Sequence, residues 1–470
     1  MNKSIKLLNF DSCGNISLRE MMRTVIRLSI PTILAQVSSV VMQYIDSAMV
    51  GSMGAYASAA IGLVSSTTWL LNGLCTALAT GFSVQVAQFI GAQRYDDARS
   101  VFRQSLVVAM LFGIFLSSVG VSVSGVLPGW LGGSEEIRAK ASEYFLIYAC
   151  SIPATQLRVI CTSSLQCSGD MKTPSLLNIN MCFLDVIFNF LLIYPTRVLS
   201  FFGLEVTVLG AGLGVGGAAL GTAFADYTTA LLMLGIAAFK SPRLALRHGG
   251  SWKIRKQCIG TMFKISLPAG FEHIVVSGAY IAGTLIVAPL GTVAVAANSL
   301  AVTAESFCYM PGYGIGSAST TLVGQSMGAD RPDIAIRFAR CAVSLGVGIM
   351  ALAAVLMFFV APWMFAMLTP SAEVRSLGAD MLRIAAFSEP LYAASIVSAG
   401  ALRGAGDTFV PSILNLVSMW GVRITLAFIL VPHIGLYGFW IAMCIELCVR
   451  GVLFLIRLLK GKWSQKKIVV

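Results

Sequence analysis

Acidic residues inside long apolar stretches are the first feature of this sequence that could do chemistry. Asp46, Asp185 and Asp226 each interrupt a hydrophobic run in the first half of the chain. An ionised side chain at the centre of a membrane costs at least about 2.5–3.5 kcal/mol, so an acid in such a position is a functional candidate by default. A carboxylate there can bind and release a proton or a small cation. We expect the three aspartates to face one pocket and to form a coupling site.

The second half carries a different set of acids in its apolar stretches. Glu446 is expected to pair with a nearby arginine such as Arg423 or Arg450, whereas Glu389 precedes Pro390 at an expected helix break. Methionine and aromatic side chains adapt to varied ligands, and aromatic rings attract cations. We therefore expect a substrate cavity to be lined by second-half acids and their neighbours: Glu272, Glu305, Glu389, Tyr309, Met310 and Tyr313.

The elements that position these residues are expected to be membrane-spanning helices. Of 470 residues, 57% are hydrophobic and only 11% are charged, whereas about a quarter of the residues of a soluble domain are charged. The composition excludes a soluble globular protein, a disordered chain and a nucleic-acid binder. A spanning helix needs about 20 apolar residues. The apolar runs predict twelve spans, near 27–50, 60–88, 103–127, 137–166, 173–195, 215–239, 262–288, 294–324, 338–364, 372–401, 410–431 and 435–458.

The basic residues predict how these spans are oriented. The 33 Lys and Arg residues exceed the 21 Asp and Glu residues, for a net charge of +12. Most of the bases lie in the two chain ends and in the even-numbered connections, above all in the segment 240–257. Because cytoplasmic loops are rich in Lys and Arg, we expect an inner-membrane protein with both termini in the cytoplasm. The basic segment could also contact anionic membrane lipids.

Other kinds of site are not indicated. The eleven cysteines form no CxxC pair, the three histidines form no HExxH motif, and no phosphate-binding GxxxxGK[ST] loop is present. Zinc, disulfide and ATP-hydrolysing sites therefore have no sequence support. We expect a protein that is not an enzyme and has no metal and no cofactor other than its coupling ion.

An internal repeat is the strongest signal. When the chain is shifted by 237 residues, Val86-x-Gln88-x-x-Gly91-Ala92 coincides with Val323-x-Gln325-x-x-Gly328-Ala329. Gly169-Asp170 likewise coincides with Gly406-Asp407. Gly91 and Gly328 follow apolar helices and are expected to be C-cap glycines. The Gly-Asp pairs are expected to form turns before the next helix.

The repeat predicts the architecture. Six spans per half is an even number, so both halves enter the membrane in the same sense and are related by an axis along the membrane normal. We expect an all-α polytopic membrane protein in which two parallel six-helix repeats surround a central cavity. The expected parts are an N-terminal lobe (1–239), a basic cytoplasmic linker (240–257) and a C-terminal lobe (258–470). Asp46, Asp185 and Asp226 have no acidic counterpart in the second half, which marks them as a specialised site.

These motifs resemble the multidrug and toxic compound extrusion (MATE) family. The resemblance runs from about Leu28 to Gly451 and includes three runs: Pro31…Asp46-x-x-x-Val50-Gly51-x-x-Gly54, Met310-Pro311-x-x-Gly314, and Leu402-Arg403-Gly404-Ala405-Gly406-Asp407-Thr408. It implies a V-shaped bundle that exports amphipathic, often cationic, small compounds in exchange for inward H⁺ or Na⁺. We expect H⁺, with Na⁺ as the alternative, and a chain that acts as a monomer.

The resemblance also implies roles for individual residues. Asp46 and Asp185 match the acids of the cation site in the DinF-like branch, and Thr222 matches a threonine that lines this site. Asp226 lies four residues after Thr222 and hence on the same helix face. Where relatives carry an asparagine four residues before the second aspartate, this chain has Met181. Its place could be taken by Asn178 or Asn189, and Pro31 would act as a hinge in the first span.

Other functions stay open on the sequence alone. A flippase for lipid-linked saccharides of the same superfamily would keep the fold, but would need cavity bases, for which Arg158, Arg383 and Arg423 are the candidates. A membrane enzyme would need a convergent nucleophile–base or metal-binding set, and none stands out. A receptor or channel would not need acids confined to one repeat.

Overall fold

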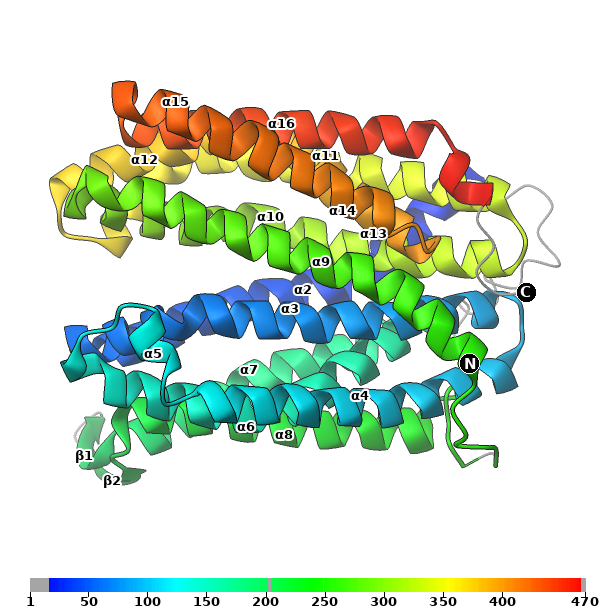
Figure 1. Cartoon of the computed structure of the whole chain (residues 1–470), viewed down its shortest axis with the longest axis horizontal. Helices are drawn as coiled ribbons and strands as arrows, with labels where there is room; N and C mark the ends of the chain where they lie inside the picture. The colour runs from blue at the N-terminus through cyan, green and yellow to red at the C-terminus, as the bar shows by residue number, and fades with distance from the viewer. Residues whose placement is uncertain (1–16, 202–203, 248, 466–470) are drawn as a thin grey trace.

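The computed structural model describes residues 17–201, 204–247 and 249–465, and these are almost entirely helical (Figure 1). The first half contains α2 (Leu18–Gly51), α3 (Ala55–Gly91), α4 (Tyr95–Val123), α5 (Leu127–Trp130), α6 (Glu135–Cys167), α7 (Lys172–Ile193), β1 (Pro195–Phe201), β2 (Leu204–Ala211) and α8 (Gly214–Gly235). The second half contains α9 (Lys256–Val287), α10 (Thr292–Gly328), α11 (Pro332–Leu368), α12 (Ala372–Ala386), α13 (Glu389–Gly404), α14 (Phe409–Leu416), α15 (Thr425–Ile434) and α16 (Leu436–Leu459).

The helices form two groups that lie side by side (Figure 1). We call α2–α8 the first lobe and α9–α16 the second lobe. The end of the bundle where α2 begins and α16 ends is the terminal end, and the opposite end, which carries α5, β1 and β2, is the hairpin end (Figure 1).

The predicted spans are confirmed. Eleven helices in the described part of the chain are long and apolar enough to cross a membrane. The tenth predicted span, 372–401, is divided into α12 and α13 because the helix breaks at Phe387 and Ser388, just before Glu389 and Pro390. Proline lacks a backbone N–H and therefore fits the first turn of a helix but not its interior. The eleventh span is a rod in which a π-helical segment, Val417–Ile424, joins α14 to α15.

The first helix of each half crosses from one lobe to the other. At the terminal end of α2, Met21 and Val25 pack in the core of the second lobe, and Thr32 Oγ1 donates a hydrogen bond to the Gly314 carbonyl at 2.9 Å. The helix runs unbroken through Pro31, whose role as a hinge stays a prediction. In the repeat-related helix α9, Cys258 and Met262 pack in the core of the first lobe. These crossings tie the lobes together at the terminal end.

The longer fifth connection of the first half forms an antiparallel hairpin. Strand β1 pairs with β2 from Pro195↔Ala211 to Phe201↔Leu204, with an irregularity between Pro195 and Arg197. The Arg197 guanidinium lies 4.0 Å from the centre of the Tyr194 ring and 4.4 Å from that of Phe190. Cation–π contacts of this kind fix the base of the hairpin on the end of α7.

The two glycine motifs have different outcomes. Gly169 and Gly406 adopt φ values of 94° and 81°, as expected for turn glycines. The interpretation of Gly91 and Gly328 as C-cap glycines is wrong. Each ends its helix in helical conformation, and the left-handed residues are Gln93 (φ 59°) and Asp330 (φ 57°), two positions later. Their small size serves the packing between the lobes, because a side chain at either glycine would overlap the backbone of the opposite lobe.

The buried ion pair at the terminal end gives a test of the fold. Asp407 is fully buried and accepts a hydrogen bond of 2.5 Å from Arg457, whereas Asp333 is exposed on the surface beside Arg331. Removing one partner of a buried pair costs about 3–5 kcal/mol, and an exposed pair contributes at most about 1 kcal/mol. Asp407→Asn should therefore lower the apparent melting temperature in detergent far more than the matched Asp333→Asn. Equal losses would contradict this description of the pair.

Candidate functional site

The two aspartates Asp46 and Asp185 meet between α2 and α7, near the hairpin end of the first lobe. Asn189 joins them, because its Nδ2 donates hydrogen bonds of 3.0 Å both to Asp46 Oδ1 and to Asp185 Oδ2. Asp185 and Asn189 are buried and Asp46 is half-buried. The two carboxyl groups lie side by side, and Thr222 contacts Asp185 from α8. Three helices therefore contribute to one compact cluster, which we call the carboxyl pair.

The carboxyl pair has unsatisfied polar atoms. Asp185 Oδ1 and Asn189 Oδ1 are buried and have no hydrogen-bond partner in the described part of the chain. Most buried polar atoms of a folded protein have a partner, so such orphans call for an explanation such as a bound proton, ion or water. Of the two candidate asparagines, Asn189 lies in the cluster. Asn178 lies seven residues before Asp185, about 10 Å along the helix, and its side-chain oxygen is buried without a partner.

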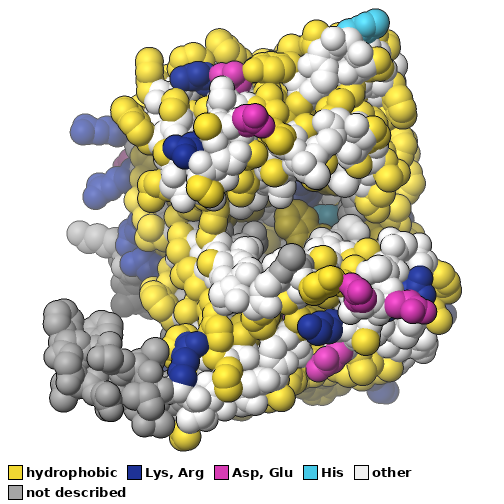
Figure 2. All heavy atoms as spheres, turned by 90° about the vertical axis from the view of Figure 1, so that its left-hand side faces the viewer, with side chains coloured by type: hydrophobic (Ala, Val, Ile, Leu, Met, Phe, Trp, Pro, Cys, Tyr) yellow, Lys and Arg dark blue, Asp and Glu magenta, His cyan; other side chains and the backbone are white. Residues whose placement is uncertain are grey.

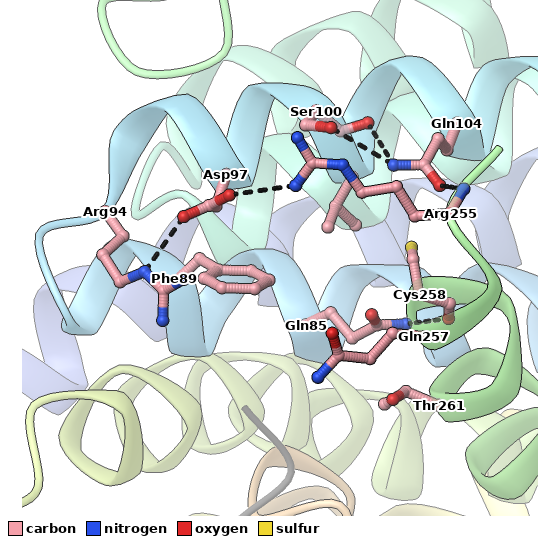
Figure 3. A pocket seen from close by; sticks show the side chains of 11 residues that line it. Gln85, Phe89, Arg94, Asp97, Ser100, Gln104, Arg255, Gln257, Cys258 and Thr261 are labelled. Carbon is pink, nitrogen blue, oxygen red and sulfur yellow. Dashed lines mark hydrogen bonds and ion pairs between the residues drawn. The ribbon is translucent and has the colours of Figure 1, made fainter. Parts of the chain in front are cut away.

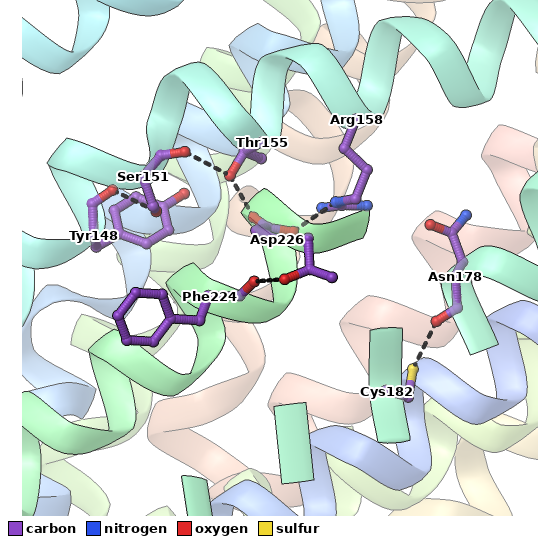
Figure 4. Close-up of polar contacts among 9 residues, drawn as sticks. Tyr148, Ser151, Thr155, Arg158, Asn178, Cys182, Phe224 and Asp226 are labelled. Carbon is purple, nitrogen blue, oxygen red and sulfur yellow. Dashed lines mark hydrogen bonds and ion pairs between the residues drawn. The ribbon is translucent and has the colours of Figure 1, made fainter. Parts of the chain in front are cut away.

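Asp226 does not join the carboxyl pair. Arg158 Nε lies 2.6 Å from Asp226 Oδ1, and Thr155 Oγ1 donates a 2.5 Å hydrogen bond to Asp226 Oδ2 (Figure 4). Both partners project from α6 towards α8, and Asp226 is 5% exposed. An arginine at this distance balances the charge of the carboxylate, so Asp226 has a partner of its own. Its charge still acts on Asp185, and its membership of one coupling site stays a prediction. The position of Asp226 on its helix does not indicate its partner, because Arg158 lies 68 residues earlier in the chain.

A second group of acids lies inside the second lobe. Glu305 of α10 is 4% exposed, and Glu389 at the start of α13 is fully buried. Both carboxylate oxygens of Glu389 lack a hydrogen-bond partner among the described residues, although the Cys308 thiol lies beside it. Because α13 begins at Glu389 and Pro390 after a break, Glu389 lies where the helix is interrupted inside the bundle. The sequence predicts that both acids lie in spans. That Glu305 and Glu389 lie near each other follows only from the packing of the helices.

Glu272 lies apart from these two acids. Asn415 Nδ2 donates a 2.8 Å hydrogen bond to Glu272 Oε1, and Arg403 approaches the same oxygen at 4.0 Å. The next residue, His273, faces the other lobe, since a side chain at Gly73 of α3 would collide with its ring. Glu272 is therefore already held by two groups of its own lobe, Asn415 and Arg403, and their proximity depends on the packing of the helices.

The aromatic residues of α10 take part in a cluster of tyrosines. The Tyr309 ring lies 5.6 Å from that of Tyr392 and 6.1 Å from that of Tyr313. Tyr313 is 38% exposed, so the cluster reaches an open surface. Met310 is half-buried next to it in sequence, and no polar contact defines its role.

Two arginines of the second lobe, Arg450 and Arg423, contact an acid or aromatic rings. Arg450 forms the predicted ion pair with Glu446, at 3.1 Å, and its guanidinium lies 5.2 Å from the centre of the Tyr392 ring. Arg423 stacks between two rings, 5.7 Å from Tyr280 and 5.5 Å from Phe439.

A cleft separates the lobes at the hairpin end. Seen from this end, the surface is hollowed between the two halves of the molecule (Figure 2). Asp46 lies on α2 five residues before the helix ends on this side, so the carboxyl pair is near the open face. The lobes also touch close to the carboxyl pair, because Tyr44 of α2, two residues before Asp46, stacks on Phe307 of α10 with ring centres 5.4 Å apart.

The chain is similar to known proteins over almost its whole length. The family model MatE matches it twice, at residues 31–191 and 268–429, and the two matches begin 237 residues apart, as the internal repeat does. The probable multidrug resistance protein NorM of Thermotoga maritima is 25% identical over 456 residues, which cover 96% of this chain and 95% of that protein. A protein of the same description from Idiomarina loihiensis is 27% identical over 449 residues, 92% of each chain.

Solved structures confirm the fold. A structure described as the outward-facing conformation of a multidrug resistance MATE family transporter of the MOP superfamily superposes with a TM-score of 0.87. It is 20% identical and covers 99% of this chain and 100% of that one. The twelve-helix, two-repeat architecture predicted from the sequence is therefore confirmed.

The Arg158–Asp226 pair can be tested by changing one or both residues. Asp226→Asn or Arg158→Gln alone leaves one buried charge without its partner and should cost about 3–5 kcal/mol of stability. The double variant removes both charges and should recover most of the lost melting temperature in detergent, together with wild-type transport of a fluorescent organic cation. A double variant that is stable but inactive would instead return Asp226 to the coupling site.

Proposed function

The chain belongs to the multidrug and toxic compound extrusion family, and we propose that it is a secondary active antiporter that exports amphipathic, cationic compounds in exchange for inward H⁺. The relatives described as multidrug resistance proteins support export of drug-like compounds. The coupling ion and the charge of the cargo rest on the residues of this chain. The two lobes, 1–239 and 258–470, would move against each other around the linker 240–257.

The carboxyl pair is the observation that carries the proposal. None of the ion pairs in the described part of the chain involves Asp46 or Asp185, whereas Asp226, Glu446 and Asp407 each have an arginine. Two adjacent carboxyl groups without a base cannot both stay ionised at low cost, so they favour sharing one proton. Asn189 suits this state because its amide group donates to both. A bound Na⁺ would need oxygen ligands instead. The oxygens Asp46 Oδ1 and Asp185 Oδ2, which could coordinate it, already accept hydrogen bonds from Asn189.

The position of the carboxyl pair supports the direction of exchange. A proton that enters the cleft from the hairpin end would reach Asp46 first, because Asp46 is half-exposed and Asp185 is buried. Protonation removes a negative charge from the first lobe and would weaken its attraction for a cationic compound. The compound would then leave through the same cleft, and the empty transporter would return inward to release the proton.

The second-lobe acids are a second candidate for binding the cation itself. Glu305 and Glu389 lie near the tyrosine cluster, and an acid beside aromatic faces attracts organic cations. Glu272, already held by Asn415 and Arg403, is a weaker candidate.

The orientation and surroundings of the chain are part of the proposal. The distribution of Lys and Arg supports a cytoplasmic terminal end in the inner membrane, which makes the open hairpin end the outer face. The basic linker would lie at the level of the anionic headgroups. We propose that the monomer is the working unit, since each chain contains both lobes.

The saccharide flippase is less well supported. Recognition of a sugar phosphate needs free bases in the cavity, but Arg158 is paired with Asp226, Arg383 with Asp380, and Arg423 is held between two rings. These three arginines therefore already have partners within their own lobes and are less available to bind a phosphate.

A single aspartate variant tests proton coupling. In liposomes with an imposed pH gradient and no Na⁺, Asp46→Asn should reduce ethidium transport at least about tenfold, which is a loss of about 1.4 kcal/mol. The matched control Asp96→Asn removes an acid whose side chain is 96% exposed on α4 and should leave transport unchanged. Transport that appears only when Na⁺ is added would replace H⁺ by Na⁺ as coupling ion. No transport with either ion would favour the flippase.

The driving force gives a second test. Exchange of one monovalent cation for one proton moves no net charge, so it should respond to the pH gradient, about 1.4 kcal/mol per unit, and not to the membrane potential. A neutral compound exchanged for a proton would also gain about 2.3 kcal/mol per 100 mV. We expect ethidium efflux to follow the pH gradient at zero potential. A strong dependence on potential at constant pH would contradict a one-to-one exchange.

A further inference from the structure

The repeated Val-x-Gln-x-x-Gly motif brings two glutamines to the boundary between the lobes. Gln325 of α10 donates a 2.8 Å hydrogen bond from Nε2 to the carbonyl of Cys167 in the first lobe. Gln88 of α3 donates one of 3.4 Å to the carbonyl of Gly404 in the second lobe. Donors and acceptors are both 237 residues apart, so the internal repeat relates one bond to the other. Both glutamines are almost fully buried, at 3% and 1% exposure.

The acceptors of these bonds are helix ends. Cys167 is the last residue of α6 and Gly404 the last residue of α13. Carbonyls in the last turn of a helix have no partner within the helix and need one from outside. In this structure the partner comes from the opposite lobe in both cases. When the lobes part, water can take over both bonds, so the contact can open without leaving a buried group unsatisfied.

The motif glycines let the backbones come close enough for this contact. A side chain at Gly91 would overlap the carbonyl of Gln325, and one at Gly328 would overlap the carbonyl of Gln88. This mutual approach explains why both helices end in glycine although neither glycine adopts a left-handed conformation. Nearby, a β-carbon at Gly324 would lie 2.8 Å from that of Ala87, so α3 and α10 are packed without space between them.

In the described part of the chain, these glutamine and glycine contacts join the lobes at the terminal end. The contacts lie in the last turns of α3, α6, α10 and α13, at the terminal end, whereas the hairpin end is hollowed between the lobes (Figure 2). The start of α9 adds charged contacts at the same end, since Arg255 lies 3.2 Å from Asp97 and its N–H donates to Gln104 at 2.7 Å (Figure 3).

We propose that Gln88, Gly91, Gln325 and Gly328, with the carbonyls of Cys167 and Gly404, form a two-fold clasp that seals the terminal end of the transport pathway and opens once in every transport cycle. The inference rests on the proposed function, since only a transporter needs both ends to open in turn. Neutral amide–carbonyl bonds suit this task, because each contributes only about 0.5–1.5 kcal/mol net, or roughly twofold to tenfold in the open-to-closed ratio.

A native cysteine allows the clasp to be closed by one substitution. Thr321 Oγ1 of α10 lies 4.0 Å from the Cys167 thiol of α6, across the boundary between the lobes. Thr321→Cys should therefore form a disulfide with Cys167 on oxidation, which mass spectrometry of the linked peptides detects. We expect the linked protein to lose ethidium transport in liposomes and to regain it on reduction. Thr321→Cys combined with Cys167→Ser is the matched control and should transport under both conditions.

The outcomes separate this inference from the proposed function. If neither the reduced variant nor the wild type transports ethidium, the proposed function is contradicted. The disulfide with Cys167 would still show that the two lobes meet at this point. Failure of the disulfide to form would overturn the clasp, and so would a fully linked protein that transports as fast as the reduced one.

A second variant tests the clasp without a cross-link. Gly91→Ala should keep the lobes apart at the terminal end, while an alanine in a helix is itself favourable. We expect at least fivefold faster labelling of Cys167 by a maleimide, quantified on its peptide, and reduced transport. Gly62→Ala, on the same helix with open space around the new methyl group, is the control and should change neither. Equal labelling in both variants would contradict the clasp.

Discussion

The cost of an unpaired charge in a hydrocarbon environment is the constraint on which this structure depends. Even on the lenient scale it is about 2.5–3.5 kcal/mol per residue, and the chain meets it in two ways. Asp226, Glu446 and Asp407 each have an arginine within 3.1 Å. Asp46 and Asp185 form no ion pair with any residue that the structure describes, and they share an asparagine instead. The same constraint therefore separates acids that are paired with an arginine from acids that are held by an amide.

The duplicated architecture determines where the two lobes contact each other. The first helix of each half packs against the other lobe at the terminal end, and α3 and α10 touch there through their last turns. At the hairpin end the lobes diverge around a cleft, and the carboxyl pair lies near this open face. Asp46 therefore lies near the opposite end of α2 from the contacts that tie the lobes together, two residues from the Tyr44–Phe307 stack.

Much of the fold could be predicted from the sequence, because apolar runs, basic connections and the 237-residue repeat are properties of consecutive residues. Helix ends were less predictable, because the helices continue beyond the apolar runs. Helix α2, for example, begins at Leu18, where Ser17 and Glu20 form a capping box. Contacts between distant helices left no such signal. The pairing of Arg158 with Asp226 and the contacts of Asn189 depend on how α6, α7 and α8 pack. The spacing of these residues in the sequence does not predict that packing. The glycine of the repeated motif was misinterpreted for the same reason, because its neighbour is in the other half.

The reciprocal contact of Gln88 and Gln325 is of the isologous type, in which the same surface serves both partners. Such a contact is what a symmetric homodimer of half-length chains would present, so the polypeptide carries a dimer interface within a single molecule. Fusion of the halves has a consequence that a homodimer could not have. In a homodimer every substitution appears twice, whereas in the fused chain Gly283 and Val422 can stand where the other half has Asp46 and Asp185. The two halves can therefore share one interface and still differ in the acids they carry.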